Sequence, residues 1–313
     1  MDAIISALDS LELGTPVAAG NLTMYPLLTL TESAPGYLTL DEALAAGLAS
    51  VTEVSEAGSV PELLVKNLAK RPVLILDGEE LVGAKQNRIV NLTILVAAEQ
   101  TLRIPVSCVE AGRWARRSRE FMPAGRAHFA TGRARKLEQV SLSMRDSGSR
   151  RADQGAVWNE IGAKAHRMGA ESPTSAAAAM YESHRSKLDE FLERLEALPR
   201  QAGALFTING VVAGIDVFDS PATWRKSMRK LVESYGLDAL DHSGATTADA
   251  PPQPAKFMST LKKARRERFA AIGMGEDVRI NGGTVAGGSL VVDGKVIHLV
   301  AFPKAAAEQR PLL

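Results

Sequence analysis

Short runs of alternating apolar and polar residues occupy much of this chain, and several are paired across dipeptides that favour tight turns. Each pair reads as an apolar strand, an Asp-Gly or Asn-Gly turn and a second strand. Three stretches share this form: Pro72–Gly83 around Asp77-Gly78, Ala204–Ile215 around Asn209-Gly210, and Ser289–Val300 around Asp293-Gly294. Repeated use of one hairpin solution explains the likeness more economically than internal duplication.

Helical periodicity separates these strand runs. The clearest apolar stripe lies within residues 181–198 and consists of Leu188, Phe191, Leu192, Leu195 and Leu198. Residues 153–168, 219–237 and 256–273 also read as helices, the second beginning at Asp219 or Ser220 with Pro221 in its first turn. A short helix after residue 38 would be capped by Thr39 or Asp41.

The remaining segments read as connections. Residues 115–155 are basic and rich in Gly and Ser, which predicts a flexible connection. Residues 241–255 predict an exposed loop, and the glycine-rich residues 273–288 predict turns, since they match neither a P-loop nor a dinucleotide fingerprint.

The pattern predicts an α+β fold, with largely antiparallel or mixed sheets built from hairpins and with helices packed against them. We expect a single domain over residues 21–303 with two lobes, 21–145 and 151–303. Residues 1–20 and 304–313 would then be peripheral termini.

Composition narrows the function classes. The 313 residues are 45% hydrophobic and 23% charged, which is typical of a globular protein. No apolar run approaches the roughly 18 residues that span a bilayer, and the first residues lack a basic leader, so we expect a cytoplasmic protein with no membrane partner. A net charge of +1 argues against general nucleic-acid binding.

The number of cysteines limits the metal and redox chemistry that the chain can support. The single cysteine excludes an internal disulfide and a cysteine-based zinc site, and no metal ligands are assigned. If a metal binds, carboxylate ligands would favour magnesium. The basic stretch from Arg113 to Lys136 suits either a small anionic ligand or a solvated loop.

The candidate chemistry lies at one end of a predicted hairpin. If residues 88–96 pair with 102–110 across a central loop, Val90 faces Cys108 and Arg88 faces Glu110 on the same side. This pair is either a plain salt bridge or part of a ligand site, because an unmatched buried charge costs about 3–5 kcal/mol. Neighbouring acids, amides and an aromatic ring favour the ligand site: Asp77, Glu79, Gln86, Asn87, Arg113 and Trp114. Cys108, inward-facing in this register, is predicted to be inert rather than nucleophilic.

Several of these residues lie in stretches that resemble a known protein family. Residues 76–91, 104–114 and 210–240 resemble an uncharacterised bacterial family, the ADP-ribosylglycohydrolase- and rhodanese-phosphatase-associated protein domain, from about Asn21 to Leu240. The resemblance implies a setting in ADP-ribose or NAD metabolism without implying a reaction. The motif residues that it carries over are Glu79, Glu80, Gln86, Asn87, Arg88, Cys108, Glu110, Arg113, Trp114, Asp216 and Trp224.

Two functions fit the residues and the resemblance. In the first, an enzyme processes an ADP-ribose- or NAD-related nucleotide. Glu79, Glu80 or Glu110 acts as general base or metal ligand. Arg88 and Arg113 hold phosphate, Trp114 stacks on the base or ribose, Gln86 and Asn87 bind the ligand, and Asp216 adds a carboxylate or merely ends a strand.

In the second, a non-catalytic ligand-sensing or scaffold module uses Arg88 and Glu110 as a fixed structural pair. Solvent access distinguishes the enzyme from the non-catalytic module. An open cleft lined by Glu79, Glu110 and Arg113 favours the enzyme. Burial of these side chains, with each paired to another, favours the module. Exposed hairpin edges would also allow a homodimer.

Overall fold

The structure is a computed structural model that describes residues 2–30, 34–55, 61–115, 117–244 and 252–304. Within these ranges largely antiparallel strands and helices make up an α+β fold, as the sequence predicts, and only β4 and β7 pair in parallel among the described strands. Part of the expected loop at residues 241–255 lies outside the described residues. None of the described helices is both long and apolar enough to cross a membrane.

The largest sheet contains strands from both the N-terminal and the C-terminal parts of the chain. Its strand order is β1 (Leu11–Leu13), β3 (Leu22–Thr29), β13 (Gln201–Ile208), β14 (Val211–Phe218), β18 (Lys295–Pro303), β17 (Val285–Val292), β16 (Glu276–Asn281) and β15 (Arg265–Ala270), with β2 (Val17–Ala19) also paired to β3. Because β3 pairs with β13, the expected N-terminal lobe loses its first strand to this sheet. Residues 11–19 likewise enter the sheet rather than remaining peripheral.

Two smaller sheets form what we call the small lobe, residues 38–127. One has the order β12 (Phe121–Ala127), β8 (Glu79–Gly83), β9 (Arg88–Val90), β11 (Thr101–Cys108), β6 (Glu62–Asn67) and β5 (Ala49–Glu53). The other has the order β10 (Ile94–Val96), β7 (Val73–Ile75) and β4 (Leu38–Thr39). β5 also lies beside β12, so the six-stranded sheet curls around its own apolar face.

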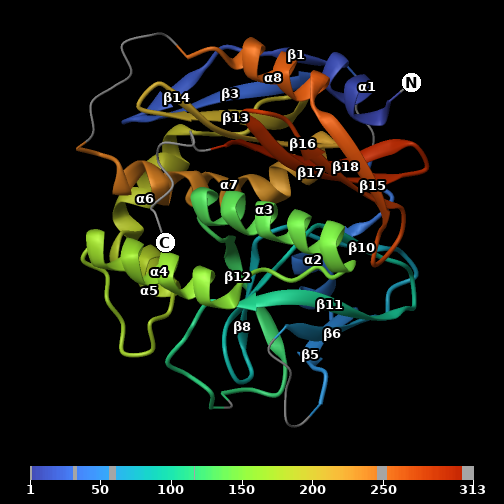
Figure 1. The fold of residues 1–313 in the computed structure, drawn as a ribbon, viewed down its shortest axis with the longest axis vertical. Coiled ribbons are helices and arrows are strands. Elements are labelled where there is room, and N and C mark those ends of the chain that lie inside the picture. The colour runs from blue at the N-terminus through green and yellow to red at the C-terminus, as the bar shows by residue number, and fades with distance from the viewer. Residues whose placement is uncertain (1, 31–33, 56–60, 116, 245–251, 305–313) are drawn as a thin grey trace.

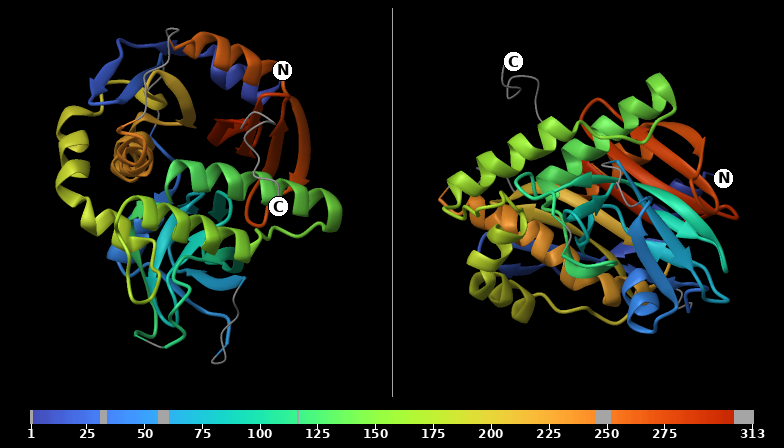
Figure 2. Two further views of the ribbon diagram at one scale, coloured as in Figure 1. Left: turned by 60° about the vertical axis from the view of Figure 1, so that its left-hand side comes forward. Right: turned by 90° about the horizontal axis from the view of Figure 1, so that it is seen from below.

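Helices cover both faces of the large sheet. The helices of the described residues are α1 (Ala3–Asp9), α2 (Leu40–Ala45), α3 (Ala130–Ser147), α4 (Gln154–Arg167), α5 (Ala178–Ser183), α6 (Arg185–Arg194), α7 (Pro221–Asp241) and α8 (Pro254–Lys263), of which α2 packs on the small lobe. α1 and α8 lie on the outer face, whereas α3 and α7 lie between the sheet and the small lobe (Figure 1). Figure 2 shows this layered order from two other sides.

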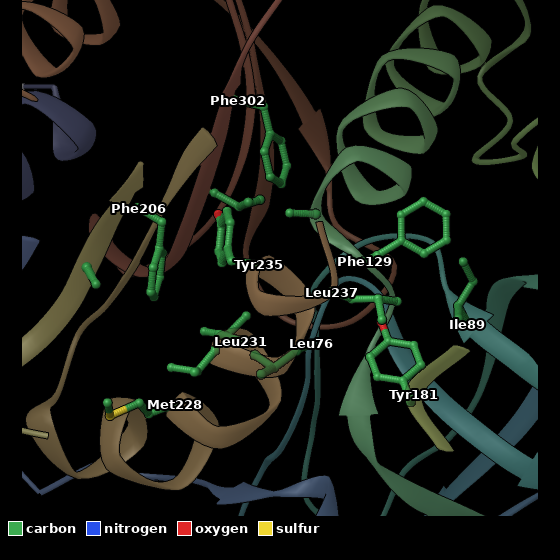
Figure 3. Packing of buried hydrophobic residues seen from close by; sticks show 14 of the residues in the cluster. Leu76, Ile89, Phe129, Tyr181, Phe206, Met228, Leu231, Tyr235, Leu237 and Phe302 are labelled. Carbon is green, nitrogen blue, oxygen red and sulfur yellow. The ribbon is translucent and has the colours of Figure 1, made fainter. Parts of the chain in front are cut away.

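The main core follows the same layers. Phe206, Tyr235 and Phe302 pack between α7 and the large sheet, while Phe129 and Tyr181 continue the cluster toward the small lobe (Figure 3). The rings of Phe206 and Tyr235 stack with centroids 4.2 Å apart. One apolar cluster therefore links the large sheet to the small lobe through α7.

Local capping signals are confirmed at two helices. Thr39 and Glu42 form a reciprocal capping box at the start of α2. Ser220 caps α7, with Pro221 in its first turn.

Two of the three predicted hairpins are present. β13 and β14 turn on Asn209 and Gly210, with φ of 50° and 80°, and β17 and β18 turn on Asp293 and Gly294, with φ of 49° and 75°. Positive φ at both central residues is what a type I′ turn requires. At Asp77-Gly78 only Gly78 has a positive φ, 76°, and the chain passes from β7 to β8 in a different sheet. The first predicted hairpin is therefore wrong.

The predicted register between residues 88–96 and 102–110 is also wrong. Val90 faces Val106, and Arg88 faces Cys108 instead of Glu110. The ladder with β11 ends near Asn91, whose side chain bonds to Ser107 and to the Arg150 carbonyl, and β10 then pairs with β7. A shift of two residues keeps each side chain on its predicted face, so the inward position of Cys108 is retained.

Three further segment predictions are wrong. Residues 115–155 contain β12 and the 18-residue helix α3 rather than a flexible connection. The helix expected over 256–273 ends at Lys263, and Arg265–Ala270 instead forms the charged edge strand β15, because pairing with β16 overrides helix propensity. The glycine-rich segment 273–288 supplies β16 and the start of β17.

Candidate functional site

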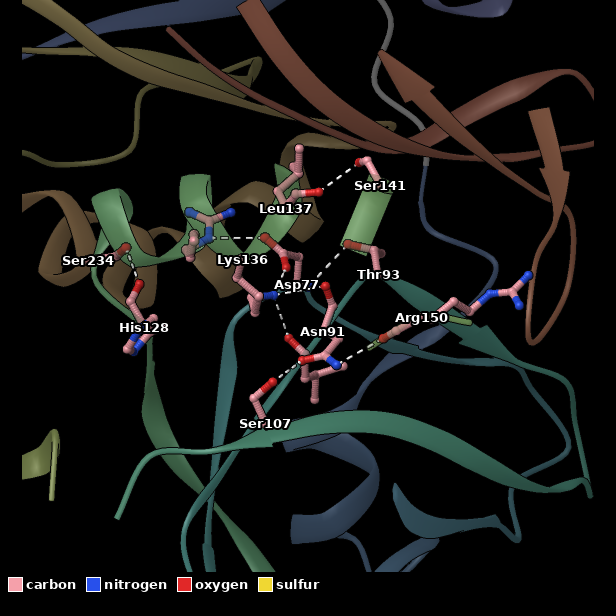
Figure 4. Close-up of polar contacts among 12 residues, drawn as sticks. Asp77, Asn91, Thr93, Ser107, His128, Lys136, Leu137, Ser141, Arg150 and Ser234 are labelled. Carbon is pink, nitrogen blue, oxygen red and sulfur yellow. Dashed lines mark hydrogen bonds and ion pairs between the residues drawn. The ribbon is translucent and has the colours of Figure 1, made fainter. Parts of the chain in front are cut away.

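Asp77 follows β7, and two cations of α3 hold its carboxylate. Lys136 Nζ donates to Asp77 Oδ1, and Arg133 Nε lies 3.4 Å from Oδ2 (Figure 4). Lys136 Nζ also donates to two backbone carbonyls at the end of β9, each at 2.9 Å. Gly78 makes room for this contact, since a Cβ there would lie 2.9 Å from Arg133 Cγ.

Arg133 also binds Asp216 of β14, and both side chains are fully buried. Its two Nη atoms donate to the Asp216 carboxylate at 2.6 and 3.2 Å, and Tyr235 donates to the same group at 2.8 Å. Burial by itself raises the pKa of Asp216, but the Arg133 guanidinium and a hydrogen bond from His298 outweigh it and hold that pKa well below its usual range. Asp216 is therefore a fixed anion.

His298 closes this arrangement into a ring of contacts. Its Nε2 lies 3.2 Å from Asp216 Oδ1, and its Nδ1 lies 2.7 Å from Thr93 Oγ1. Because Nε2 faces a carboxylate, it is the donor, and neutral His298 accepts at Nδ1 from the Thr93 hydroxyl. That hydroxyl accepts in turn from the backbone N–H of Asp77 at 3.1 Å. The ring joins the small lobe, α3 and the large sheet.

Glu79 and Glu80, the first two predicted catalytic residues, lie on opposite sides of β8 and have separate partners. Glu79 accepts from Lys230 of α7, which also binds Asp41 at 2.6 Å. Burial lowers the pKa of Lys230, but these two carboxylates raise it by more. Glu80 forms an ion pair of 2.6 Å with Arg126 of β12.

Glu110, the third predicted catalytic residue, is paired with Arg113. Nε and Nη2 of Arg113 reach Glu110 Oε2 at 2.8 and 2.6 Å, and Thr174 donates to Oε1 at 2.9 Å. The backbone N–H of Asn87 and the Gln86 amide also bond to Glu110. Burial raises the pKa of Glu110, but Arg113, Thr174 and the Asn87 backbone N–H lower it below its usual value.

Arg88 does not form the predicted pair with Glu110. One nitrogen donates to Gln86 Oε1 at 2.9 Å, and its Nε and Nη2 are buried without a hydrogen-bond partner among the described residues. Its guanidinium carbon lies 5.7 Å from the ring centroid of Trp114, which is 49% exposed. Burial lowers the pKa of Arg88 and raises that of Cys108, across the strand pair, to about 11.

The nine predicted site residues thus separate into four places. Glu110, Arg113, Asn87, Gln86 and Arg88 share one cluster, with Trp114 at its rim. Glu79, Glu80 and Asp216 each belong to a different ion pair or network. All except Trp114 are buried, so they do not line a common open cleft.

Comparison with known proteins places the whole region in one family. A family model described as the ARG and Rhodanese-Phosphatase-superfamily-associated Protein domain matches residues 10–302. The chain belongs to this family. No match was found among curated proteins or among solved structures. The family region extends beyond the resemblance visible in sequence, which ends near Leu240, and includes every candidate residue above.

Sequence reasoning missed most of the cations that complete these pairs in this member of the family. They come largely from the basic stretch, as Arg126, Arg133 and Lys136, and from α7, as Lys230. A signal was present, because Arg133 stands in the same helical stripe as Leu137, Val140 and Met144. A charged residue in an apolar stripe indicates a buried counter-charge.

The arrangement restricts what chemistry the family site can perform. Among the residues that the structure describes, no group of three or more His, Cys, Asp or Glu side chains could hold a metal ion. A general base must reach its proton directly or through one water molecule, whereas the predicted carboxylates already accept hydrogen bonds from cations inside the protein.

Proposed function

We propose that this protein is a non-catalytic ligand-sensing module that acts beside ADP-ribosylglycohydrolase and rhodanese–phosphatase family enzymes. Its ligand would be an ADP-ribose- or NAD-related nucleotide. The family description supports the association with these enzymes, and the ADP-ribosylglycohydrolase among them is the reason for proposing this ligand class.

The burial and pairing of the three predicted catalytic carboxylates carry the proposal. Glu79, Glu80 and Glu110 are 2%, 1% and 1% exposed, and each is paired with a cation. These three carboxylates were expected to line an open catalytic cleft, but they are buried and bound to cations of the protein. This favours a fixed structural role over acid–base catalysis.

Hydrolysis would demand that one of these groups exchange its partner for water or substrate. Breaking a buried pair by removing one partner costs about 3–5 kcal/mol. That penalty would be added to the barrier of every turnover. A binding module avoids the penalty because its buried pairs remain intact while the ligand is held elsewhere.

The test combines binding with turnover. The purified protein is incubated with ADP-ribose, NAD and AMP, with and without magnesium, while melting temperature and nucleotide consumption are followed. We expect at least one nucleotide to raise the melting temperature and none to be consumed.

Two outcomes would overturn the proposal. A wild-type turnover that is lost in Glu79→Gln, Glu80→Gln or Glu110→Gln, but kept in the surface control Glu193→Gln, would restore the hydrolase hypothesis. Stabilisation by none of the nucleotides would remove the nucleotide-sensing function.

A further inference from the structure

A largely apolar pocket of about 360 Å³ opens at the surface beside the N-terminal turn of α3. We call it the α3 pocket. Its other walls come from the β13–β14 turn, the C-terminal end of α7 and the end of β18. Its lining residues include Ala134, Ile208, Asn209, Val212, His242 and Phe302. A volume above about 300 Å³ with mostly apolar walls is typical of small-molecule sites.

The apolar walls suit a flat ring. Half-buried Ile208 and Val212 contribute branched aliphatic groups, whereas Phe302 is 1% exposed and offers almost no open ring face. Val211 at the rim is 58% exposed, which places further apolar surface at the entrance. Dispersion against such walls favours a planar heterocycle over a sugar or a free phosphate.

The polar rim of the α3 pocket offers hydrogen-bond acceptors. His242 Nδ1 lies 2.8 Å from the backbone carbonyl of Asp238. A carbonyl only accepts, so Nδ1 carries the proton, and Nε2 of the neutral ring is an acceptor. Asn209 donates through Nδ2 to the carbonyl of His242 at 2.9 Å, which leaves Oδ1 as a second acceptor.

We propose that the α3 pocket binds a planar heterocycle that carries an amino group, such as the adenine ring of an adenine nucleotide. The apolar walls hold the ring, and the amino group donates to His242 Nε2 or Asn209 Oδ1. This inference rests on the proposed nucleotide-sensing function and supplies its binding site.

The position of the pocket also connects the ligand with the buried ion network. Thr131 and Ala134 line the pocket on either side of Arg133 along α3. Asp238, another wall residue, caps α3 by accepting from the Thr131 N–H at 2.7 Å. A bound ring therefore contacts the helix whose cations hold Asp77 and Asp216.

Adenosine and purine riboside provide the direct test. They differ in that purine riboside has a hydrogen atom where adenosine has the amino group, so the acceptors of the rim should discriminate between them. We expect adenosine to bind at least about fivefold more tightly, as measured by isothermal titration calorimetry, because purine riboside has no amino group to donate to these acceptors. Equal affinities, or tighter binding of purine riboside, would contradict the proposed polar contacts.

Two variants locate the site. Ala134→Phe fills the pocket from α3 and should weaken adenosine binding at least about tenfold, whereas Ser147→Phe, at the far end of the same helix, should bind as the wild type does. His242→Phe keeps a ring but removes Nε2, so adenosine should lose much of its advantage over purine riboside. Circular dichroism and the melting temperature of each free variant check that it folds.

Failure of this inference is distinguishable from failure of the proposed function. Undiminished adenosine binding by Ala134→Phe would exclude the α3 pocket while leaving nucleotide sensing intact. Absence of any nucleotide binding by the wild type would overturn both. Nucleotide turnover that depends on Glu110 would overturn only the non-catalytic function.

Discussion

At the scale of single residues, the charged side chains of this protein act mainly as partners for one another. Arg133, Lys136 and Lys230 are buried and bind carboxylates from elements distant in sequence. These buried charges neutralise one another, so they contribute to internal pairing rather than to the protein surface.

Cys108 should be unreactive in the native protein. Its side chain is buried, and burial raises its pKa to about 11, so almost no thiolate forms near neutral pH. We expect no reaction with Ellman's reagent at pH 8 in the folded state and one thiol per chain in denaturant. Rapid labelling of the native protein would show that the thiol is accessible and activated.

Glu160 should make stability depend on pH. Burial raises its pKa from 4.5 to about 7, and nearby Arg135 only partly opposes this. Since the folded state favours the protonated form, the contribution of Glu160 to stability is full below about pH 4.5 and is lost as the pH rises through 7.

The measurement compares melting temperatures of the wild type and Glu160→Gln between pH 4.5 and 8. The wild type should lose stability relative to the variant as the pH rises, because only the wild type must ionise a buried carboxyl. A constant difference between the two proteins would show that the carboxyl titrates normally.

At the scale of elements, turns and helix caps could be predicted because they depend on neighbouring residues. The turns at Asn209-Gly210 and Asp293-Gly294 follow from residues that tolerate positive φ. Asp77-Gly78 has the same signature, but its conformation is set by Arg133 and Lys136 from a helix more than 50 residues away. Local sequence does not contain that information.

The element with the largest expected effect on stability is α3. Replacing Arg133 with Met leaves Asp216 and Asp77 without a guanidinium in a sealed site, so we expect a loss of about 3–5 kcal/mol in urea unfolding. Arg135→Met is the matched control on the same helix. Its partner is Glu160 and its side chain is 67% exposed, so its loss should stay below about 1 kcal/mol. Equal effects of the two substitutions would show that the buried network contributes little.

At the scale of the whole molecule, the chain is interwoven rather than divided in sequence order. β3 from the N-terminal region pairs with β13, while Asp77 and Thr93 of the small lobe reach α3 and β18. The main apolar cluster also includes residues of both the large sheet and the small lobe. Each part also has an apolar cluster of its own, but this shared cluster joins them, which supports the proposal of a single domain.

We therefore expect one cooperative thermal transition. Differential scanning calorimetry should give a single peak whose calorimetric and van't Hoff enthalpies agree. Two resolved peaks, or a van't Hoff enthalpy far below the calorimetric value, would mean that the small lobe unfolds independently.

The sequence by itself determined the α+β class, the presence of caps before α2 and α7, two hairpin turns and the inward side of Cys108, and the structure chose Thr39 over Asp41 and Ser220 over Asp219 as the caps. These features depend on side-chain period and on local backbone preference, which neighbouring residues specify. It also singled out Glu110, Arg113, Asn87 and Gln86, which do meet, because they are close in the chain or on adjacent strands.

Only the tertiary structure decided the strand partners and the counter-ions. The register that places Arg88 opposite Cys108 is set by the pairing of β9 with β11, and the buried positions of Arg133 and Lys136 follow from where α3 packs. Pairings of this kind join residues far apart in sequence, and their free energy depends on burial that exists only after the chain has folded.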